Sequence, residues 1–286
     1  MSLSKEYKDY GNVHFQARDY IGAEGLYSKA IMADPKNALL YTNRALSRIK
    51  LGMWDSAASD CSTCLSLSPN NMKAHYYLAQ SHFELKNYDD ALEHALLAHG
   101  ACAATSDKSI SSITALVLRC KKQCWEAADR ARHREATDLE RELMELLDKQ
   151  RDEALGQEEE ALQRDSIGKE CDLKQALLRD IFDRARNKTE TRREVPDWAI
   201  DEISFGFMVD PVVTKTGKSY ERASIMEHLR RHPSDPLTRE PLQPSDLRPN
   251  IALRQACDDF LKDNGWAVDW FLSRCLDDMT LRTDGI

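Results

Sequence analysis

The sequence predicts a mainly α-helical protein that ends in a small α+β domain, and three observations carry this prediction. The first third of the 286-residue chain repeats with a period of 34 residues. The stretch from Glu126 to Glu194 is dense in charge, contains no proline and carries leucines at helical spacing. The stretch 203–250 instead places short apolar runs between turns that contain proline or glycine. A chain of this length accommodates two domains, or one domain and a long connector.

Composition and charge exclude several classes of protein. The net charge of −8 argues against a general nucleic-acid binder, which would show a basic footprint. The first residues are polar and lack the apolar core of a signal peptide, and no apolar run is long enough to cross a membrane. The chain is therefore expected in the cytoplasm, and in the nucleus as well, where thiols stay reduced.

The eight cysteines are scattered along the chain and show no regular pairing. Cys61 and Cys64 have the spacing of a redox or zinc pair, yet no second pair of ligands follows at zinc spacing. We therefore expect both to be small apolar residues packed on one side of a helix. Neither a metal ion nor another cofactor is predicted.

The repeat in the first third is defined by small and aromatic residues at fixed positions of the segments 4–37, 38–71 and 72–105. The eighth, twentieth and twenty-seventh residues are small, so that two helices approach closely, and the seventeenth is aromatic and caps the turn between them. In order along the chain these residues are Gly11, Tyr20, Ala23 and Ala30, then Ala45, Trp54, Ala57 and Cys64, then Ala79, Tyr88, Ala91 and Ala98.

This pattern resembles the tetratricopeptide repeat, a helix–turn–helix unit that stacks into a solenoid. Pro35 and Pro69 end the first two repeats, as helix breakers should. The third repeat has Ala103 at that place, so its last helix is expected to run on. The segment 110–125 is predicted to form a further amphipathic helix that caps the solenoid, which gives a domain over residues 4–125.

The inner helices of this solenoid carry a set of donors suited to an anion. Lys8, Asn12, Asn43 and Lys73 stand at corresponding places in successive repeats. Each lysine alone would be an ordinary solvated residue, but asparagine in a helix interior costs stability that alanine would not. A carboxylate accepts hydrogen bonds from both ammonium and amide groups.

These four residues match the carboxylate clamp of tetratricopeptide domains, and the resemblance implies a ligand. In that family the clamp binds the acidic C-terminal tails of heat-shock chaperones, which end in Glu-Glu-Val-Asp with a free carboxylate. Lys50, two turns after Asn43, would add a contact. Many clamps carry an arginine one turn after the last lysine, whereas Tyr77 stands there in this chain and would line a pocket for an apolar side chain upstream in the tail.

The middle region, residues 126–195, is predicted to form two amphipathic helices. Gly156 and Gly168 are expected to interrupt the helical pattern, and the stretch between them would join the two helices into a hairpin. Two such chains would pair as a coiled-coil dimer, while the alternative is a monomeric spacer that packs back on the repeats. Periodicity alone leaves these alternatives even. The apolar positions are Leu139, Leu143, Leu146, Leu147 and Leu155, followed by Leu173, Leu177, Leu178, Ile181 and Phe182.

The C-terminal region has the element order of a compact α+β domain. A turn is expected at Asp210-Pro211, two short strands around Gly217, and a short helix within 221–232. Asn250 is predicted to cap a second helix that Gly265 closes. The inward residues are predicted to be Ile225, Met226 and Leu229 on the first helix, and Leu253, Ala256, Phe260 and Leu261 on the second.

A domain of this size usually needs a metal or disulfides, yet the stretch 203–250 contains no cysteine and only two histidines, His228 and His232. The order Ile-Ser-Phe, Asp-Pro-Val, Tyr-Glu-Arg, Asp-Pro-Leu-Thr, Pro-Asn resembles the U-box, over residues 196–270. The U-box is a RING-like domain in which hydrogen bonds and salt bridges replace zinc. Asp210, Pro211 and Asn250 are predicted to be structural residues of this domain.

The U-box resemblance implies that the domain binds a ubiquitin-conjugating enzyme and holds its ubiquitin thioester in a reactive pose. Ile203 and Phe205 from one loop and Pro236 from another would contact that enzyme, with His228 beside them. Arg239 would donate hydrogen bonds to both enzyme and ubiquitin. The alternatives are a core position for the two apolar residues, a turn former at Pro236, a packed histidine and a solvated arginine.

The combination of repeats, helical middle and U-box resembles the family of co-chaperone ubiquitin ligases. It implies a homodimer that docks a chaperone by its tail and marks the chaperone or its misfolded client with ubiquitin for the proteasome. Nucleic acid and membrane are not expected as partners. The alternatives are an adaptor with a degenerate U-box and a co-chaperone that suppresses aggregation by itself. The segment 271–286 receives no function.

Overall fold

A computed structural model describes residues 3–105, 107–157, 159–189 and 194–270, most of them helical. By its internal contacts the chain divides into two compact units. One unit joins Met1–Trp125 with Pro196–Ile286, and the other is Glu126–Val195. Among the described helices, none combines the length and apolar character needed to span a bilayer. The segment 271–286, to which the sequence assigned no function, lies outside the described residues.

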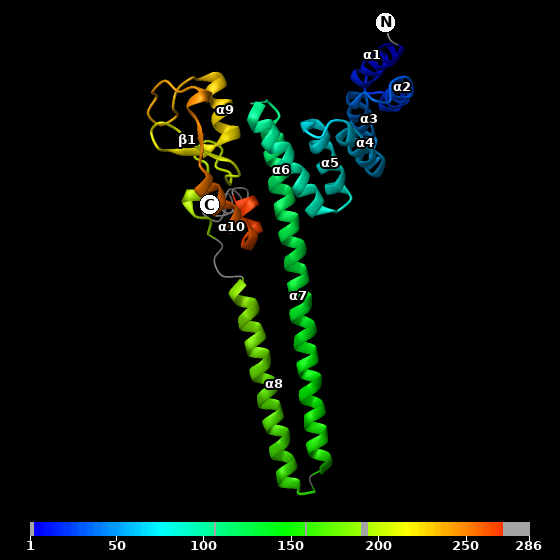
Figure 1. Ribbon diagram of the computed structural model, residues 1–286. Coiled ribbons are helices and arrows are strands. Elements are labelled where there is room, and N and C mark those ends of the chain that lie inside the picture. Colours follow the sequence, from blue (N-terminus) through cyan, green and yellow to red (C-terminus); the bar gives the residue numbers. More distant parts are fainter. Residues whose placement is uncertain (1–2, 106, 158, 190–193, 271–286) are drawn as a thin grey trace, which may run out of the picture. The chain divides into compact units, whose positions relative to one another are not determined.

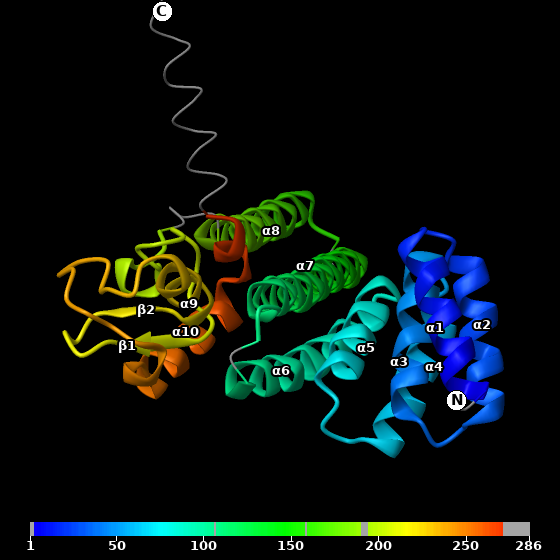
Figure 2. The ribbon, with the colours of Figure 1, turned by 90° about the horizontal axis from the view of Figure 1, so that it is seen from above.

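Six helices form the repeat region, and Figures 1 and 2 show them as successive antiparallel pairs. Each pair corresponds to one 34-residue repeat, so the predicted solenoid is confirmed. The helices are α1 (Leu3–Gln16), α2 (Tyr20–Ala33), α3 (Ala38–Lys50), α4 (Trp54–Leu67), α5 (Met72–Glu84) and α6 (Tyr88–Thr105).

The predicted small residues lie at the contacts between helices. All seven alanines and the cysteine of the repeat pattern are fully buried. At Gly11 a Cβ atom would stand only 2.7 Å from the Tyr27 ring, so nothing larger than glycine fits there. Cys61 and Cys64 are free, buried thiols, as predicted, and burial raises the pKa of both.

The last helix of the solenoid is longer than predicted. α6 continues to Thr105, four residues beyond the 14-residue length of α2 and α4, as the missing proline indicated. α7 (Ile110–Gln157) begins as the expected capping helix but is a single 48-residue helix that continues past Trp125. No proline occurs between its ends, so no residue there breaks the helix.

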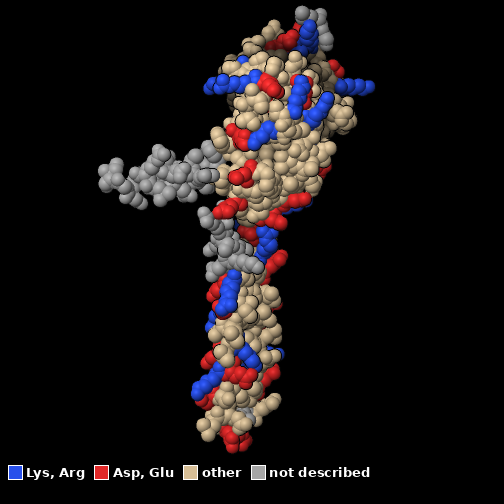
Figure 3. Space-filling model, turned by 90° about the vertical axis from the view of Figure 1, so that its left-hand side faces the viewer, with Lys and Arg blue, Asp and Glu red and all other residues tan. Residues whose placement is uncertain are grey.

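The second unit contains the C-terminal part of α7 and α8 (Ala161–Thr189). Cys171 Sγ lies 3.6 Å from the Leu147 carbonyl and Gln175 Nε2 donates to Asp148 Oδ1 at 2.9 Å, so the two helices pack as the predicted hairpin. Acidic and basic side chains alternate over its surface (Figure 3), in pairs such as Lys174–Glu170 at 2.8 Å.

The prediction that Gly168 interrupts the helix is wrong. Gly168 lies inside α8, and Gly156 is in the last turn of α7, so the connection between the helices is much shorter than the segment 156–168. A glycine in a helix costs about 1 kcal/mol relative to alanine, which strong helix formers on both sides outweigh.

The U-box region contains a three-stranded antiparallel sheet of order β2-β1-β3. Gly217, at φ 84°, lies in the turn between β1 and β2, as the hairpin prediction required. Val212 pairs with Tyr220 on one side and Pro249 on the other. The elements are β1 (Pro211–Val213), β2 (Ser219–Glu221), α9 (Arg222–Arg231), β3 (Arg248–Pro249) and α10 (Ile251–Asp263), with single turns at Asp197–Ala199, Pro244–Asp246 and Gly265–Asp269.

The core of this domain forms where α9 covers the sheet. The predicted inward residues Ile225, Met226 and Leu229 are buried there against Val212 and Tyr220. On α10 the most buried residues are Cys257 and Leu261, while the other three residues of the predicted face are half-buried.

Gly265 does not close α10 in the predicted way. The helix ends at Asp263, its C-cap Asn264 has φ −131°, and Gly265 does not have the left-handed conformation of a glycine cap. Instead, a Cβ atom on Gly265 would stand 2.4 Å from Trp125 Cβ, so close packing requires the glycine. The Trp125 indole N–H donates to the Asp263 carbonyl at 3.0 Å, which fixes the ring at this place.

Candidate functional site

The first candidate site lies on the odd-numbered helices of the solenoid, which carry the predicted clamp residues. Lys8 and Asn12 are on α1, Asn43 and Lys50 on α3, and Lys73 and Tyr77 on α5. The hydroxyl of Tyr27 on α2 donates to Asn12 Oδ1 at 2.8 Å. This bond fixes the side chain of Asn12 and leaves its amide nitrogen as a donor.

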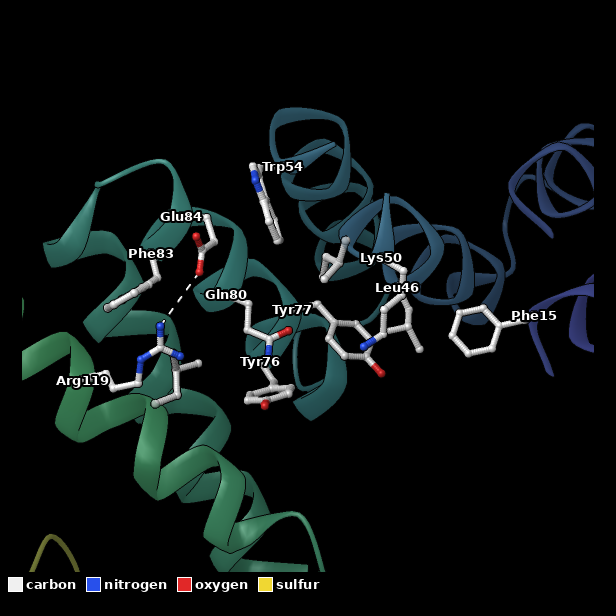
Figure 4. Close-up of a pocket in the computed structure, with 12 residues that line it drawn as sticks. Phe15, Leu46, Lys50, Trp54, Tyr76, Tyr77, Gln80, Phe83, Glu84 and Arg119 are labelled. Carbon is white, nitrogen blue, oxygen red and sulfur yellow. Dashed lines mark ion pairs between the residues drawn. The ribbon is translucent and has the colours of Figure 1, made fainter. Parts of the chain in front are cut away.

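A cavity of about 460 Å³ opens beside these helices and has mainly apolar walls, with five aromatic residues among those that line it (Figure 4). Two of the predicted clamp residues, Lys50 and Tyr77, line it together, on the side drawn next to Leu46. The remaining lining residues are Phe15, Leu46, Ile49, Trp54, Tyr76, Gln80, Phe83, Glu84, Leu116 and Arg119. We call this cavity with its lining the aromatic groove.

The aromatic groove combines apolar walls with separated charges. The Arg119 guanidinium lies over the Phe83 ring, 4.3 Å from its centroid, and its Nη2 atom lies 3.9 Å from Glu84 Oε1. Both contacts are at the end of the groove away from Lys50 (Figure 4). Burial raises the pKa of Tyr76 and Tyr77, so both hydroxyls stay protonated at neutral pH. The groove therefore offers an apolar pocket flanked by cationic donors.

Most of the aromatic groove is absent from the sequence prediction. Tyr76 and Gln80 lie one turn apart on α5 next to Tyr77, and this spacing was a signal that could have found them. Phe15 and Arg119 carry no such signal. They come from α1 and α7, and only the curvature of the solenoid brings them to one cavity.

The second candidate site is formed by two loops of the U-box, which we call loop one (residues 201–206) and loop two (residues 235–240). Loop one is built around the carboxylate of Asp201, which is fully buried. Asp201 Oδ2 accepts from the amide and hydroxyl of Ser204, at 2.8 and 2.6 Å, and from the Ser224 hydroxyl at 2.6 Å. Its Oδ1 accepts from the Glu221 amide at 2.9 Å.

Loop two is built in the same way around Asp235, which is also buried. Asp235 Oδ1 accepts from the amides of Leu237 and Thr238 at 2.8 and 3.2 Å. Its Oδ2 accepts from the Thr216 hydroxyl at 3.1 Å. Burial opposes ionisation, but these hydrogen bonds prevail and lower the pKa of Asp235.

The backbones of the two loops also match. The fifth residue of each loop, Phe205 and Arg239, has a positive φ of 55° and 62°. Each donates its amide to the carbonyl of the first residue, at 2.8 Å in loop one and 2.9 Å in loop two. The first residue donates in turn to the carbonyl of the sixth, and an isolated bridge flanks each loop. Two buried carboxylates thus order two tight loops.

Two further buried carboxylates join loop one to the sheet. Glu221 Oε2 accepts from the amides of Val209 and Asp210 at 2.7 and 2.8 Å, and burial raises its pKa to about 7. Asp210 accepts from Arg222 Nε at 2.6 Å and from Arg254. The Asn250 side chain caps α10 by accepting from the Leu253 amide at 3.1 Å and donates to the Ser219 hydroxyl at 3.0 Å.

These bonds give physical roles to the predicted structural residues. The Pro211 carbonyl accepts from the Asn250 amide at 2.8 Å, so the turn at Asp210-Pro211 is tied to the start of α10. In the described part of the domain, hydrogen bonds between buried carboxylates and backbone amides therefore hold the loops together.

The residues predicted to contact a conjugating enzyme lie on these two loops and on α9. Ile203 is half-buried against the domain core, whereas Phe205 is 54% exposed. The reason is the positive φ of Phe205, which turns the backbone after Ser204 is bound to Asp201. Pro236 is half-buried beside Arg239 in loop two, and His228 Nε2 lies 3.0 Å from the Ser234 carbonyl.

Leu237 is a further candidate that the sequence did not reveal. Its side chain is 65% exposed because its amide is bound to Asp235, which directs the side chain out of the loop. A solvent-exposed leucine next to Pro236 adds apolar area to the surface that loop two presents.

Family models match both structured regions of the first unit. The U-box domain model matches residues 195–266, and the model described as "Anaphase-promoting complex, cyclosome, subunit 3" matches residues 10–98. The predicted U-box resemblance is therefore confirmed. This chain combines a tetratricopeptide solenoid with a U-box.

Known proteins match the chain over different lengths. E3 ubiquitin-protein ligase CHIP of Arabidopsis thaliana is 29% identical over 269 residues, which are 93% of this chain and 96% of that protein. The Hsp70/Hsp90 co-chaperone CNS1 of Saccharomyces cerevisiae is 28% identical over 48% of this chain and 36% of its own length. The solved TPR2B-domain:pHsp70-complex of yeast Sti1 has 27% identity and a TM-score of 0.42, and the match covers 43% of this chain and 99% of that one. The resemblance to repeat-containing co-chaperone ubiquitin ligases, inferred from the sequence, is confirmed by the near full-length match to the plant protein.

Proposed function

We propose that this protein is a chaperone-associated ubiquitin ligase, in which the solenoid binds the chaperone and the U-box promotes ubiquitin transfer. The observation that carries the proposal is that one chain holds both a groove with aromatic and cationic lining and a U-box whose two loops are ordered by buried carboxylates. The near full-length similarity to a plant ubiquitin ligase supports the same pairing of functions.

The ligand of the solenoid is an acidic chaperone tail with a free C-terminal carboxylate. Lys8, Asn12, Asn43 and Lys73 would donate to the carboxylates at the end of the tail, and Lys50 would donate to a further acidic side chain. The aromatic groove next to Lys50 and Tyr77 would take an apolar side chain upstream. Charged hydrogen bonds of this kind contribute about 1.5–3 kcal/mol each, so a single donor has a measurable effect.

The contribution of the U-box is positioning. The amine of a substrate lysine attacks the thioester between ubiquitin and the conjugating enzyme, and the thiol of that enzyme is the leaving group. The ligase forms no covalent intermediate and holds the thioester in a reactive orientation. Ile203, Phe205, Pro236 and Leu237 would contact the conjugating enzyme, His228 would support loop two through the Ser234 carbonyl, and Arg239 would bridge enzyme and ubiquitin.

Arg239 is suited to this bridging role by its place in loop two. Its backbone is fixed in the left-handed region by the bond to Asp235, and its side chain makes no ion pair with any residue in the described ranges. Because the backbone is fixed and the side chain has no ion pair in the described ranges, the five N–H donors of the guanidinium remain available to partners.

Tail binding is tested with a labelled peptide that ends in Glu-Glu-Val-Asp. Lys73→Ala is expected to weaken binding by roughly 10- to 100-fold, the effect of losing one charged hydrogen bond. Lys86→Ala is the matched control, because Lys86 lies in the same repeat at the turn between α5 and α6. Equal affinity of both variants, or equal binding of a peptide with an amidated C-terminus, would contradict the assignment.

We also propose that the second unit mediates homodimerisation. Leu173, Leu177 and Ile181 follow one another at four-residue spacing on α8, and each is more than half exposed. An apolar stripe of this kind on a hairpin is typical of a surface that packs against a second copy. Sedimentation of the full chain should give a dimer, and Leu177→Glu a monomer, while Arg179→Glu on the same helix should remain dimeric.

The alternative function is a non-catalytic adaptor whose U-box engages no conjugating enzyme. The intact bonding of loops one and two disfavours it, because a degenerate domain would not retain two satisfied buried carboxylates. The cytoplasm, together with the nucleus, is the proposed location. The seven described cysteines are free thiols, which suits a reducing compartment.

A further inference from the structure

The aromatic groove has two ends with different chemistry, and the proposed function uses only one of them. Lys50 and Tyr77 line the end beside the predicted clamp, whereas Phe83, Glu84 and Arg119 line the opposite end (Figure 4). Arg119 comes from α7, the helix that follows the third repeat. We call this opposite end the α7 end of the groove.

The Arg119 guanidinium is held in place at the α7 end, yet its donors face solvent. Its side chain is 59% exposed, and the 3.9 Å between its Nη2 atom and Glu84 Oε1 is longer than a hydrogen bond. The guanidinium stacks by its face on the Phe83 ring, which leaves its edges and their N–H donors open. A carboxylate can accept two parallel hydrogen bonds from such an edge.

The charges of the groove favour an acidic side chain at this place. In the described chain the lining contains two cations, Lys50 and Arg119, and one acidic residue, Glu84. The Glu84 side chain is 44% exposed, so water screens its attraction to Arg119 and it neutralises the guanidinium only in part. Charge complementarity therefore selects an acidic residue of the ligand over a basic one.

The course of α5 indicates where in a bound tail this acidic residue stands. Tyr77 and Glu84 are seven positions apart on α5, which is about 10 Å along the helix axis. An extended peptide advances about 3.3 Å per residue and covers this distance in about three residues. The clamp holds the C-terminus of the tail, so the residues upstream of the apolar side chain at Tyr77 extend toward Arg119.

We propose that Arg119 is a specificity-determining residue, which selects chaperone tails that carry an acidic side chain about three residues before the apolar one. The inference rests on the proposed binding of an acidic tail and adds a second recognition point to the clamp. A tail with a neutral residue at that position binds through the clamp and the apolar side chain alone, and a basic residue weakens binding. Glu84 limits the selection, because it competes with the ligand carboxylate for Arg119.

The test is calorimetric titration of the full-length chain with three acetylated peptides of sequence X-Ser-Ser-Leu-Glu-Glu-Val-Asp, in which X is Asp, Asn or Lys. The unchanged protein should bind the Asp peptide roughly three- to fivefold more tightly than the Asn peptide, the effect of one exposed ion pair. The Lys peptide should bind most weakly. High salt should reduce these differences, because it screens exposed charges.

Variants at the α7 end separate Arg119 from the rest of the groove. Arg119→Gln should bind the Asp and Asn peptides equally, and Arg119→Glu should bind the Lys peptide more tightly than the Asp peptide. Glu84→Gln should bind the Asp peptide more tightly than the unchanged protein does. Arg130→Gln is the matched control, because Arg130 is an arginine of similar exposure on α7 that pairs with Glu126 and does not line the groove.

The Asn peptide shows whether a variant is folded, since Arg119→Gln should bind it as tightly as the unchanged protein does. Equal affinity of the unchanged protein for the Asp and Asn peptides would overturn the role of Arg119 and leave the clamp assignment standing. A preference for the Asp peptide that persists in Arg119→Gln would have the same meaning. Failure to bind any of the three peptides would overturn the proposed tail binding, and this inference with it.

Discussion

Loops one and two of the U-box have the same backbone bonding but differ in what their carboxylates are bound to. Asp201 is tied to residues of β2 and α9, through the Glu221 amide and the Ser224 hydroxyl. Asp235 is tied to the amides of its own loop and, outside it, to the side chains of Thr216 and Thr214 in and before the turn between β1 and β2. Loop one is therefore part of the domain core, whereas loop two is an autonomous turn attached to it.

This difference shows how a small domain is held together without metal. A zinc ion would fix each loop through ligands of similar strength. Carboxylates fix the loops through hydrogen bonds whose value depends on burial, because an unmet donor is costly only where water is excluded. The two loops should consequently respond differently to the same substitution.

The largest effect is expected for Asp201→Ala. The change strands the buried amide of Glu221 and removes the acceptor of the part-buried Ser204 amide and of two part-buried hydroxyls, and at about 1–3 kcal/mol for an unmet buried donor the U-box should lose about 3 kcal/mol or more and unfold. Hydrogen exchange of the U-box amides in the full chain measures this. Glu202→Ala, which removes an exposed partner of Lys218, is the control, and protection retained in Asp201→Ala would refute the role given to loop one.

A smaller effect is expected for Asp235→Ala. The amides of Leu237 and Thr238 lie in an exposed part of loop two, so water replaces most of the lost bonds and the cost should be about 1–2 kcal/mol. Exchange should increase in loop two while the sheet stays protected, and binding of a conjugating enzyme should weaken. Global loss of protection, equal to that of Asp201→Ala, would show that the two loops are equivalent. Glu240→Ala is the control.

The third effect, that of Glu221→Gln, is a pH-dependent gain in stability and not a loss. The folded-state pKa of Glu221 is about 7, above its ordinary value of 4.5, so the folded protein holds the proton more tightly than the unfolded chain. Its contribution to stability is full below pH 4.5 and is lost as pH rises through 7, by about 3 kcal/mol. Glutamine does not titrate, so the stability of the Glu221→Gln variant should rise relative to that of the unchanged protein between pH 5 and pH 8.

The measurement compares exchange of the Val209 and Asp210 amides, which Glu221 binds, in both proteins across this range. A constant difference between the two proteins from pH 5 to pH 8 would show that Glu221 does not titrate in this window.

The repeat region could be predicted from the sequence almost residue by residue. Its packing joins neighbouring helices and recurs every 34 residues, so the small residue found at Ala45 and Ala79 has a counterpart in each repeat. The hairpin of the U-box was predictable for a similar reason, because Gly217 encodes its turn locally.

The residues that the sequence did not reveal depend on long-range placement. Thr216 and Asp235 are 19 positions apart, and Phe15 and Arg119 meet at the aromatic groove from opposite ends of the solenoid. Glycines were also ambiguous. Gly168 continues a helix and Gly265 makes room for Trp125, although the residue type alone favours an interruption in both places.

The central claim joins the two ends of the chain, and a reconstituted ubiquitination assay tests it most directly. The substrate is a chaperone, compared with the same chaperone lacking its last few residues, and Ile203→Asp serves as the variant with a blocked U-box surface. We predict ubiquitin on the intact chaperone alone, no transfer by Ile203→Asp, and unchanged binding of the tail peptide by that variant. Equal modification of both chaperones would contradict recruitment through the clamp, and no modification across a panel of conjugating enzymes would contradict the ligase function.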